Sequence, residues 1–432
     1  MKVTIISPPY GGKGIKSHSL PMAPPVLEYL ASLIYKIAPE IEVELIDANR
    51  EDIAVESLTG DLILFSALTP QALWVYRTAD VLRKIGKKVV IGGMHVTALP
   101  EEGKLHADAV VVGEAESVMA NLLADAKKGN LSPFYYGDRL SLEGLPEKRR
   151  GLLKHKYRFD SFFTARGCPY KCTFCSVRRF FGDTIRYRPI REVVREVASS
   201  PYGMLMNIDD NIWGIDIFRS IELFKELSMG AKGKLWVGQG DLCTVQHEKG
   251  EEMLTWARRS GLTTVMAGWE SNNAATLDAY KAKTKQGRNR VEAIKKIRDN
   301  GIDVVLFVML GGLYDEMDSY KDALEFSDRL DVLVHPVMTI PYPGTDLRSE
   351  WAGHITHEFD WDMYDGMHML MSRNGTDPEE HNRALMNLWT ELFTVPRIVK
   401  RLTKISWKGF PSAHIASAMF QFAMRRAFMQ YT

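Results

Sequence analysis

Residues 166–176 read RGCPYKCTFCS and hold three of the four cysteines of the chain, Cys168, Cys172 and Cys175. Thiolates in this C-x-x-x-C-x-x-C spacing can ligate three irons of a 4Fe–4S cluster and leave the fourth iron open to another molecule. A structural zinc site normally has four protein ligands, and the remaining cysteine, Cys243, stands alone. Four cysteines in 432 residues without a secretory leader indicate a reducing, cytoplasmic setting rather than disulfides. The triplet therefore predicts an iron–sulfur cluster.

The composition is that of an ordinary globular protein, with 45% hydrophobic and 25% charged residues. A chain of 432 residues predicts two or three domains. The net charge of +1 argues against nucleic acid as a partner, because nucleic-acid-binding domains usually carry a basic excess. No run of about 20 apolar residues occurs, so we expect no transmembrane segment.

Ahead of the triplet, short apolar runs alternate with helical patterns. The predicted strands are Val3–Ile6, Glu42–Ile46, Leu62–Phe65, Val89–Ile91 and Val110–Val112, and the predicted helices are Pro25–Ile37, Ala72–Lys84 and Ser117–Lys127. Apolar strands separated by helices indicate a parallel sheet with helices on both faces. We expect an α/β fold with a doubly wound, Rossmann-like domain over residues 1–135, whose ligand would lie at the carboxyl ends of the strands. Residues 136–160 are expected to form a linker.

A second series of strands and helices begins at residue 161. Its predicted strands are Ser161–Ala165, Met204–Ile208, Leu235–Val237, Thr263–Ala267, Val304–Leu310 and Val332–Thr339. Six βα units of this size predict a partial (β/α)6 barrel over residues 161–347, with functional residues at the carboxyl ends of its strands. The cysteine triplet follows the first strand, at that end. Residues 348–432 are expected to be mainly helical.

The triplet, with Gly167 before it and Phe174 within it, resembles the signature of the radical S-adenosylmethionine (SAM) enzymes. The domain ahead of it resembles the cobalamin-binding module of the cobalamin-dependent members of that family, so the resemblance spans both predicted domains. It implies cobalamin contacts at Pro9, Tyr10, Ser66, Thr69, Gly92, Gly93, Met94, His95, Gly113 and Glu114. It implies SAM contacts at Phe174, Asp209, Asp210, Glu270, Ser271 and Gly311. An aspartate after the second barrel strand could instead cap the next helix, and Ser271 could cap the helix after it.

In that family, reduction of cluster-bound SAM gives a 5′-deoxyadenosyl radical, which removes hydrogen from an unactivated sp³ carbon, and methylcobalamin then supplies a methyl group. The resemblance implies a C-methyltransferase with a 4Fe–4S cluster, SAM and cobalamin as cofactors. It also implies an electron donor of the flavodoxin or ferredoxin type. None of the eleven histidines stands in the D-x-H-x-x-G motif that supplies the lower cobalt ligand in other cobalamin proteins. A relict or purely structural first domain is the alternative.

The methyl acceptor has two candidate classes. One is a protein or peptide side chain, as in the family's glutamine C-methyltransferase of methyl-coenzyme M reductase, and the other is a lipid or isoprenoid. From Leu392 onward the chain carries basic and aromatic residues but no Asp or Glu. This pattern favours a C-terminal helical layer and leaves a membrane-facing surface as the alternative. Cyclisation or rearrangement without methyl transfer, and an iron–sulfur protein without enzymatic activity, are further alternatives.

Overall fold

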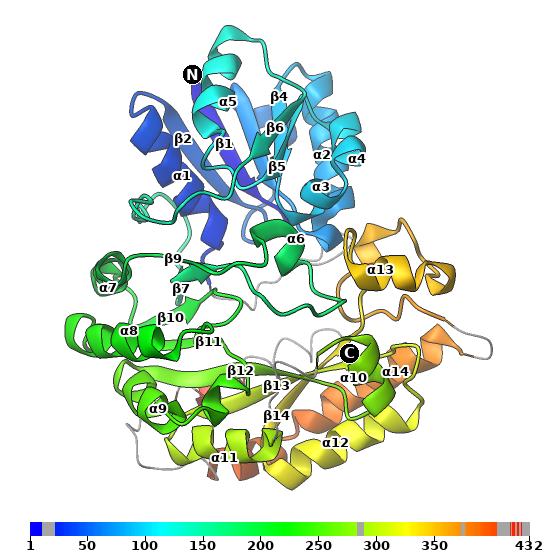
Figure 1. Cartoon of the computed structure of the whole chain (residues 1–432). Coiled ribbons are helices and arrows are strands. Elements are labelled where there is room, and N and C mark those ends of the chain that lie inside the picture. Colours follow the sequence, from blue (N-terminus) through cyan, green and yellow to red (C-terminus); the bar gives the residue numbers. More distant parts are fainter. Residues whose placement is uncertain are drawn as a thin grey trace.

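The computed structural model describes residues 1–10, 22–282, 289–372 and 376–403, together with 415, 417–419, 421, 422 and 425. Within these residues the chain forms two six-stranded parallel sheets, one above the other in Figure 1. The α/β class, the Rossmann-like first domain and the partial barrel are therefore confirmed. The domain boundaries at residues 135, 160 and 347 stay a prediction.

The first sheet has the strand order β2-β1-β3-β4-β5-β6, with every neighbouring pair parallel. Its strands are β1 (Lys2–Ser7), β2 (Glu42–Asp47), β3 (Leu62–Ser66), β4 (Lys88–Gly92), β5 (Ala109–Gly113) and β6 (Phe134–Gly137). Five of them match the predicted strands. The edge strand β6 does not, because its sequence FYYG is only four residues long and lies across the predicted start of the linker.

Helices cover both faces of this sheet. They are α1 (Pro25–Ile37), α2 (Ala72–Lys84), α3 (Met94–Ala98), α4 (Pro100–His106) and α5 (Met119–Lys128). Successive side chains of a strand point to opposite faces. Accordingly, Ile5 packs in one core with residues of α1 and α5, and Ile6 packs in the other with residues of α2 and α3. The short helices α3 and α4 were not predicted, while α1 and α2 have the predicted bounds.

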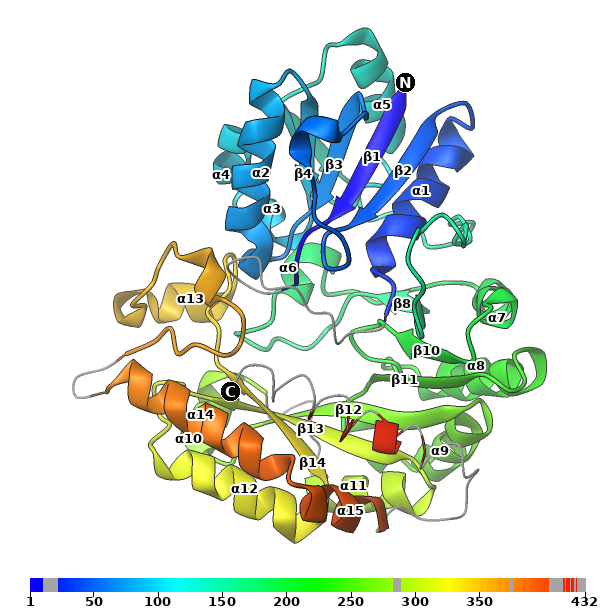
Figure 2. The same ribbon diagram turned by 180° about the vertical axis from the view of Figure 1, so that it is seen from behind.

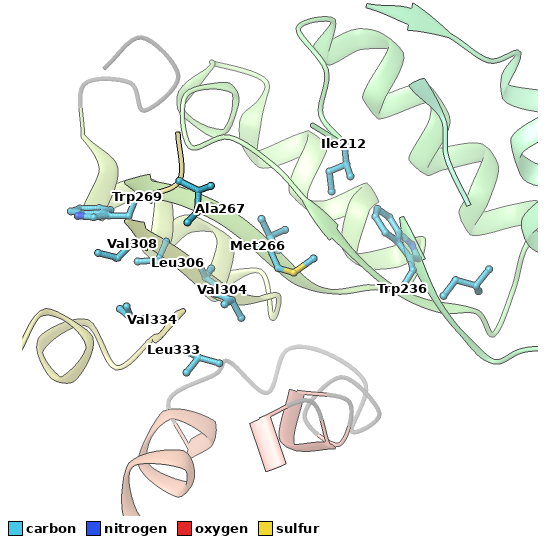
Figure 3. Close-up of a cluster of buried hydrophobic side chains, with 14 of the residues drawn as sticks. Ile212, Trp236, Met266, Ala267, Trp269, Val304, Leu306, Val308, Leu333 and Val334 are labelled. Atoms are coloured by element: carbon cyan, nitrogen blue, oxygen red, sulfur yellow. The ribbon is translucent and has the colours of Figure 1, made fainter. Parts of the chain in front are cut away.

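The second sheet has the order β14-β13-β12-β11-β10-β7, also parallel throughout, with β14 and β7 at its edges. Its strands are β7 (Asp160–Phe162), β10 (Met204–Asn207), β11 (Leu235–Gln239), β12 (Leu262–Glu270), β13 (Asp303–Leu310) and β14 (Leu333–Met338). The helices that accompany them are α7 (Ile190–Ser199), α8 (Ile217–Gly230), α9 (Gly250–Arg259), α10 (Ala274–Ala279), α11 (Arg290–Asp299) and α12 (Asp318–Leu330). Figure 3 shows part of the core that they enclose, with Trp236, Met266 and Val304 among its side chains.

A short antiparallel hairpin joins the two sheets. It consists of β8 (Ala165–Arg166) and β9 (Arg186–Tyr187), and between them lie the cysteine loop and helix α6 (Val177–Phe181). Helix α6 lies between the first domain and the barrel in both views (Figures 1 and 2). The cysteine loop, which leads into α6, is therefore placed near the boundary between the first domain and the barrel.

The described part of the C-terminal region consists of helices α13 (Asp346–Glu350), α14 (Pro378–Leu392) and α15 (Val395–Thr403) and short 3-10 turns. Helix α14 packs against α12 and β14. Arg397 forms an ion pair with Asp328, and Lys400 pairs with Asp331 at 2.9 Å. These two basic side chains thus help to fasten α15 to the barrel. Other basic and aromatic residues of the predicted tail, such as Lys404, Trp407 and Phe410, lie outside the described residues.

Candidate active site

A cavity of about 420 Å³ lies between the carboxyl edge of the first sheet and the start of the barrel. Seven of the ten residues predicted to contact cobalamin line it: Tyr10, Ser66, Gly92, Gly93, Met94, Gly113 and Glu114. The opposite wall comes from the barrel and the hairpin, through residues such as Phe163, Arg166, Ile208 and Asp210. Ligands of doubly wound sheets bind at this edge. The cavity therefore faces both the predicted cobalamin loops and the element that carries the cysteines.

Two glycines keep the backbone of the first domain close to this cavity. Gly93 has a φ of +101°, and a Cβ atom there would lie 2.6 Å from the carbonyl oxygen of Ala67. Gly113 has a φ of +87°, and a Cβ atom there would lie 2.8 Å from the carbonyl oxygen of Gly137. Both positions need glycine because the conformation and the space exclude a side chain. They give a smooth, closely packed floor that a large planar group such as a corrin fits.

The other three predicted cobalamin residues do not line the cavity. Pro9 is buried beside it. Thr69 accepts or donates a hydrogen bond at 3.3 Å to Nδ1 of His95, whose Nε2 lies 3.2 Å from Oε1 of Glu102. The same Glu102 oxygen accepts a hydrogen bond from Nε1 of Trp361 at 2.8 Å. Thr69 and His95 therefore help to attach the first domain to the C-terminal region, and their contact with cobalamin stays a prediction.

Glu114 lies in the cavity wall but binds arginines of the hairpin. Its Oε2 accepts a hydrogen bond from Arg166 at 2.6 Å, and its carboxylate also accepts from Arg186. Arg166 donates at 2.7 Å to Glu116, which accepts another hydrogen bond from Tyr29 at 2.5 Å. Burial alone would raise the pKa of Glu116, but the charge of Arg166 lowers it overall. This charge cluster ties the first domain to the residue that stands two positions before Cys168.

The cysteine loop is anchored to the carboxyl ends of distant barrel strands. The N–H of Thr173 donates to the carbonyl of Tyr280 at 3.0 Å, and the N–H of Leu347 donates to the carbonyl of Thr173 at 2.9 Å. Phe174 packs edge-on against Tyr280 with 5.3 Å between ring centroids. The loop is therefore held at its centre by the segments that follow β12 and β14.

The three thiols are free of disulfides, with Cys172 buried and Cys168 and Cys175 partly exposed. Their number and chemistry suit three irons of a cluster. In the part of the chain that the structure describes, no three His, Cys, Asp or Glu side chains are gathered into a preformed metal site. Cys243 is also free and partly exposed, and burial raises the pKa of its thiol.

Asp209 and Asp210 follow β10 but have different surroundings. Asp209 is buried and accepts three hydrogen bonds. Two come from Thr164, from its N–H at 2.7 Å and from its hydroxyl at 2.5 Å, and the third comes from the N–H of Ala165 at 3.2 Å. These bonds end β7, so the predicted strand Ser161–Ala165 is divided into β7 and β8. Asp210 lines the cavity. Neither residue caps α8, whose N-cap is Asp216.

Glu270 ends β12 in a conformation that is unusual for its residue type. Its φ is +64°, and the side chain is buried. A non-glycine residue in this region costs about 1–3 kcal/mol and is found preferentially at functional sites. The neighbouring Ser271 accepts a hydrogen bond from the N–H of Asn273, and it is Asn273 that caps α10. The strain at Glu270 supports its predicted role at the SAM site.

Gly311 follows β13 with a φ of +71°, and a Cβ atom there would lie 2.9 Å from Sδ of Met338. Met309, near Gly311 in the chain, belongs to the same buried cluster as Cys172 and Tyr280. The predicted SAM residues Phe174 and Gly311 thus lie near the cysteine loop, whereas Asp210 lines the cavity toward the first domain. The structure therefore separates the predicted SAM residues into two locations.

Sequence reasoning missed several aromatic and charged residues of the cavity lining. The sequence alone gives Arg166 no role of its own, although its place two residues before Cys168 is a usable signal. Tyr29, Phe163 and Phe181 surround its guanidinium at 4.9–5.6 Å from their ring centroids. No local motif marks these aromatic residues, because they come together only when the two domains meet.

None of the helices in the described part of the chain is both long enough and apolar enough to cross a bilayer.

Comparison with known proteins adds three findings. Residues 20–123 match the B12 binding domain family. The chain is 25% identical to the bacteriochlorophyllide d C-8(2)-methyltransferase of Chlorobaculum tepidum, over 84% of each protein. It is 26% identical to the anaerobic magnesium-protoporphyrin IX monomethyl ester cyclase of Rubrivivax gelatinosus, over 91% of this chain and 77% of the relative.

Among solved structures, the fold is similar to that of the radical SAM methyltransferase TsrM from Kitasatospora setae with cobalamin and a [4Fe-4S] cluster bound. The TM-score is 0.65 at 14% identity, and the likeness covers 100% of this chain and 99% of that one. The B12-binding match lies over the loops that line the cavity, and the cysteine triplet lies on the hairpin opposite. The chain is therefore similar to the cobalamin-dependent radical SAM methyltransferases in its B12-binding match, in its relatives and in its fold.

Proposed function

We propose that this protein is a C-methyltransferase that methylates an unactivated sp³ carbon, with a 4Fe–4S cluster, SAM and cobalamin as its cofactors. The single observation that carries the proposal is the shared cavity. Its walls come from the B12-binding loops on one side and from the hairpin that bears the cysteines on the other. A substrate in this cavity would lie between the two cofactor sites, as methyl transfer to a substrate radical requires.

The bound cofactors supply radical hydrogen abstraction and the methyl group, and the protein supplies binding, orientation and a dry site. Cys168, Cys172 and Cys175 would hold the cluster. Glu270 and Gly311, at the ends of β12 and β13, would bind SAM beside it. Gly93 and Gly113 would let the corrin approach the backbone of the first domain closely. The Arg166–Glu114 ion pair would hold the cobalamin side and the cluster side of the site in a constant position relative to each other.

The cavity favours an apolar methyl acceptor. Most of its lining is apolar or aromatic, including Tyr29, Leu30, Phe163, Phe180 and Phe181. The curated relatives are named for acting on bacteriochlorophyllide d and magnesium-protoporphyrin IX monomethyl ester, and an apolar ring compound of that kind suits this lining. The protein side chain expected from the sequence, such as a glutamine of methyl-coenzyme M reductase, is the less favoured acceptor because no described residue points to it. A lipid acceptor is compatible with the same apolar lining.

A second candidate is ring formation without methyl transfer. It is favoured by one observation, the 26% identity over 91% of the chain to a relative named as a cyclase. Both reactions begin with the same hydrogen abstraction, so the outcome depends on what meets the substrate radical.

The test is anaerobic reconstitution with iron, sulfide and cobalamin, followed by incubation with methyl-labelled SAM, a reductant and bacteriochlorophyllide d. A flavodoxin or ferredoxin can serve as the electron donor that the family resemblance implies. We expect 5′-deoxyadenosine together with labelled product. Product without label would favour the cyclase reaction, and the absence of deoxyadenosine with all cofactors bound would contradict both.

A further inference from the structure

We propose that Asp210 binds a hydrogen-bond-donating group of the substrate, an ammonium or a hydroxyl, at the barrel wall of the cavity. The inference rests on the proposed function and deepens it, because it names the kind of polar group that the apolar acceptor carries. It also assigns Asp210 to the substrate rather than to SAM.

Asp210 lies in the barrel wall of the cavity. It follows β10 and lines the cavity with Ile208 of the same segment and with Phe163 and Ala165 beside it. The B12-binding loops at Gly93 and Gly113 line the same cavity. The cysteine loop is anchored elsewhere, at the segments after β12 and β14. A ligand that fills the cavity therefore meets Asp210.

The carboxyl group of Asp210 has fewer hydrogen-bond donors than that of Asp209. Its neighbour Asp209 accepts three hydrogen bonds from Thr164 and Ala165. Among the described residues, no group other than its own N–H donates a hydrogen bond to the carboxyl of Asp210. A carboxyl group in an apolar cavity is costly unless it finds a donor. The bound substrate can supply that donor.

The other charged residues of the lining are already engaged. Glu114 and Glu116 pair with Arg166. Lys148 lies 3.3 Å from Oδ1 of Asp160 and donates to the hydroxyl of Ser161 at 2.6 Å. Among the described residues of the lining, Asp210 is therefore the carboxyl group without an ion-pair partner. This balance attracts a cation or a neutral donor and repels an anion.

Burial, followed by the charge of Asp209, raises the pKa of Asp210 to about 7. Near neutral pH the carboxyl group is thus divided between its two protonation states. A substrate ammonium would stabilise the carboxylate, while a hydroxyl can hydrogen bond to either form. A substrate carboxylate near Asp210 would be disfavoured in the ionised form.

The test uses cobalamin-loaded protein and three probes with the same aromatic body: phenethylamine, phenethyl alcohol and hydrocinnamate. Binding is measured by ligand-observed NMR. We expect the amine and the alcohol to bind more tightly than the carboxylate, and Asp210→Asn to weaken the amine about tenfold, the loss of about one charge-assisted hydrogen bond. The control Asp183→Asn removes an exposed carboxylate of the outer groove near Pro169 and should leave all three affinities unchanged.

The dissociation constants of SAM and cobalamin are measured on the same variants. Unchanged values for both, with a lost preference for the amine, support the inference. An amine preference that survives in Asp210→Asn overturns it. A loss of SAM affinity in that variant also overturns it, because Asp210 would then belong to the SAM site. Formation of deoxyadenosine by the wild type tests the proposed function separately, because probe binding does not require turnover.

Discussion

The guanidinium of Arg166 lies 2.6 Å from Oε2 of Glu114, and this ion pair joins the B12-binding domain to the element that carries the cysteines. Both side chains are largely buried, with 13% and 3% of their surfaces exposed. Gly113, the residue before Glu114, forms the cavity floor, and Gly167, the residue after Arg166, begins the approach to Cys168. This one contact therefore helps to set the position of the predicted corrin site relative to the predicted cluster site.

Arg166→Met should destabilise the protein by about 3 kcal/mol, because it leaves Glu114 and Glu116 as buried charges without this partner. Denaturant unfolding would measure the change. The matched control is Arg191→Gln, whose side chain is 80% exposed and lies 3.6 Å from Glu143. That change should cost less than about 0.5 kcal/mol. Equal effects of the two substitutions would contradict a structural role for the Arg166 cluster.

Gly93→Ala should abolish cobalamin binding and destabilise the first domain. The new Cβ atom would lie 2.6 Å and 2.7 Å from backbone atoms of Ala67, so the loop that lines the cavity must move. Gly86→Ala is the control, because Gly86 also has a positive φ, +84°, but has nothing within 4 Å of the added atom. The control should cost about 1 kcal/mol through strain alone and keep cobalamin affinity. Cobalamin titration by absorbance, with unfolding in urea, separates the two effects.

Glu270→Gly should weaken SAM binding without unfolding the protein. Glycine removes the strain of a residue held at a φ of +64°, and this gain offsets part of the stability that is lost with the attraction between the carboxylate and Arg290. The carboxylate expected at the SAM site is lost at the same time. Equilibrium dialysis with SAM and urea unfolding give the two quantities. Unchanged SAM affinity in Glu270→Gly would show that Glu270 is not part of the SAM site.

The sequence predicted most of the strands and helices but not the contacts between the domains. Helix α1 was predicted to its ends because Pro25 begins it at the first helical position, a local signal. The strand β6 was not predicted, because an edge strand needs no continuous apolar face. The network of His95, Glu102 and Trp361 joins positions far apart in the chain. Residues 92–95 lie at the carboxyl end of β4, but sequence alone could not show that His95 lies in α3 and outside the lining of the cavity.

The two predicted aspartates show the same limit at closer range. Asp209 and Asp210 are adjacent, so sequence alone assigns both of them one role. In the fold the two side chains are in different surroundings, Asp209 bound to the β7–β8 connection and Asp210 in the cavity wall. Tertiary placement of Thr164, not the motif, decides which carboxyl group remains available to a ligand.

Replacing Cys168, Cys172 or Cys175 singly by Ala should reduce bound iron and abolish formation of deoxyadenosine, because a cluster with three protein ligands cannot lose one and keep its open iron in place. Cys243→Ala is the control, since Cys243 is the N-cap of the 3-10 turn Thr244–Gln246 and is not part of the triplet. It should keep iron content and SAM cleavage. Iron and sulfide analysis after anaerobic reconstitution measures the first quantity, and chromatography of the nucleoside measures the second. Turnover that survives in any triplet variant would contradict the cluster assignment.

The pH dependence of stability should change in Asp210→Asn. The folded-state pKa of Asp210 is raised to about 7 from its ordinary value of 3.8, chiefly by burial. Ionisation therefore opposes folding, and the wild type should lose stability relative to the variant as the pH rises from about 4 to about 7. Above that range the difference should stay constant, at about 2 kcal/mol after allowing for the partly exposed position. Urea unfolding of both proteins at acidic, neutral and alkaline pH measures it, and a pH-independent difference would show that the carboxyl group titrates normally.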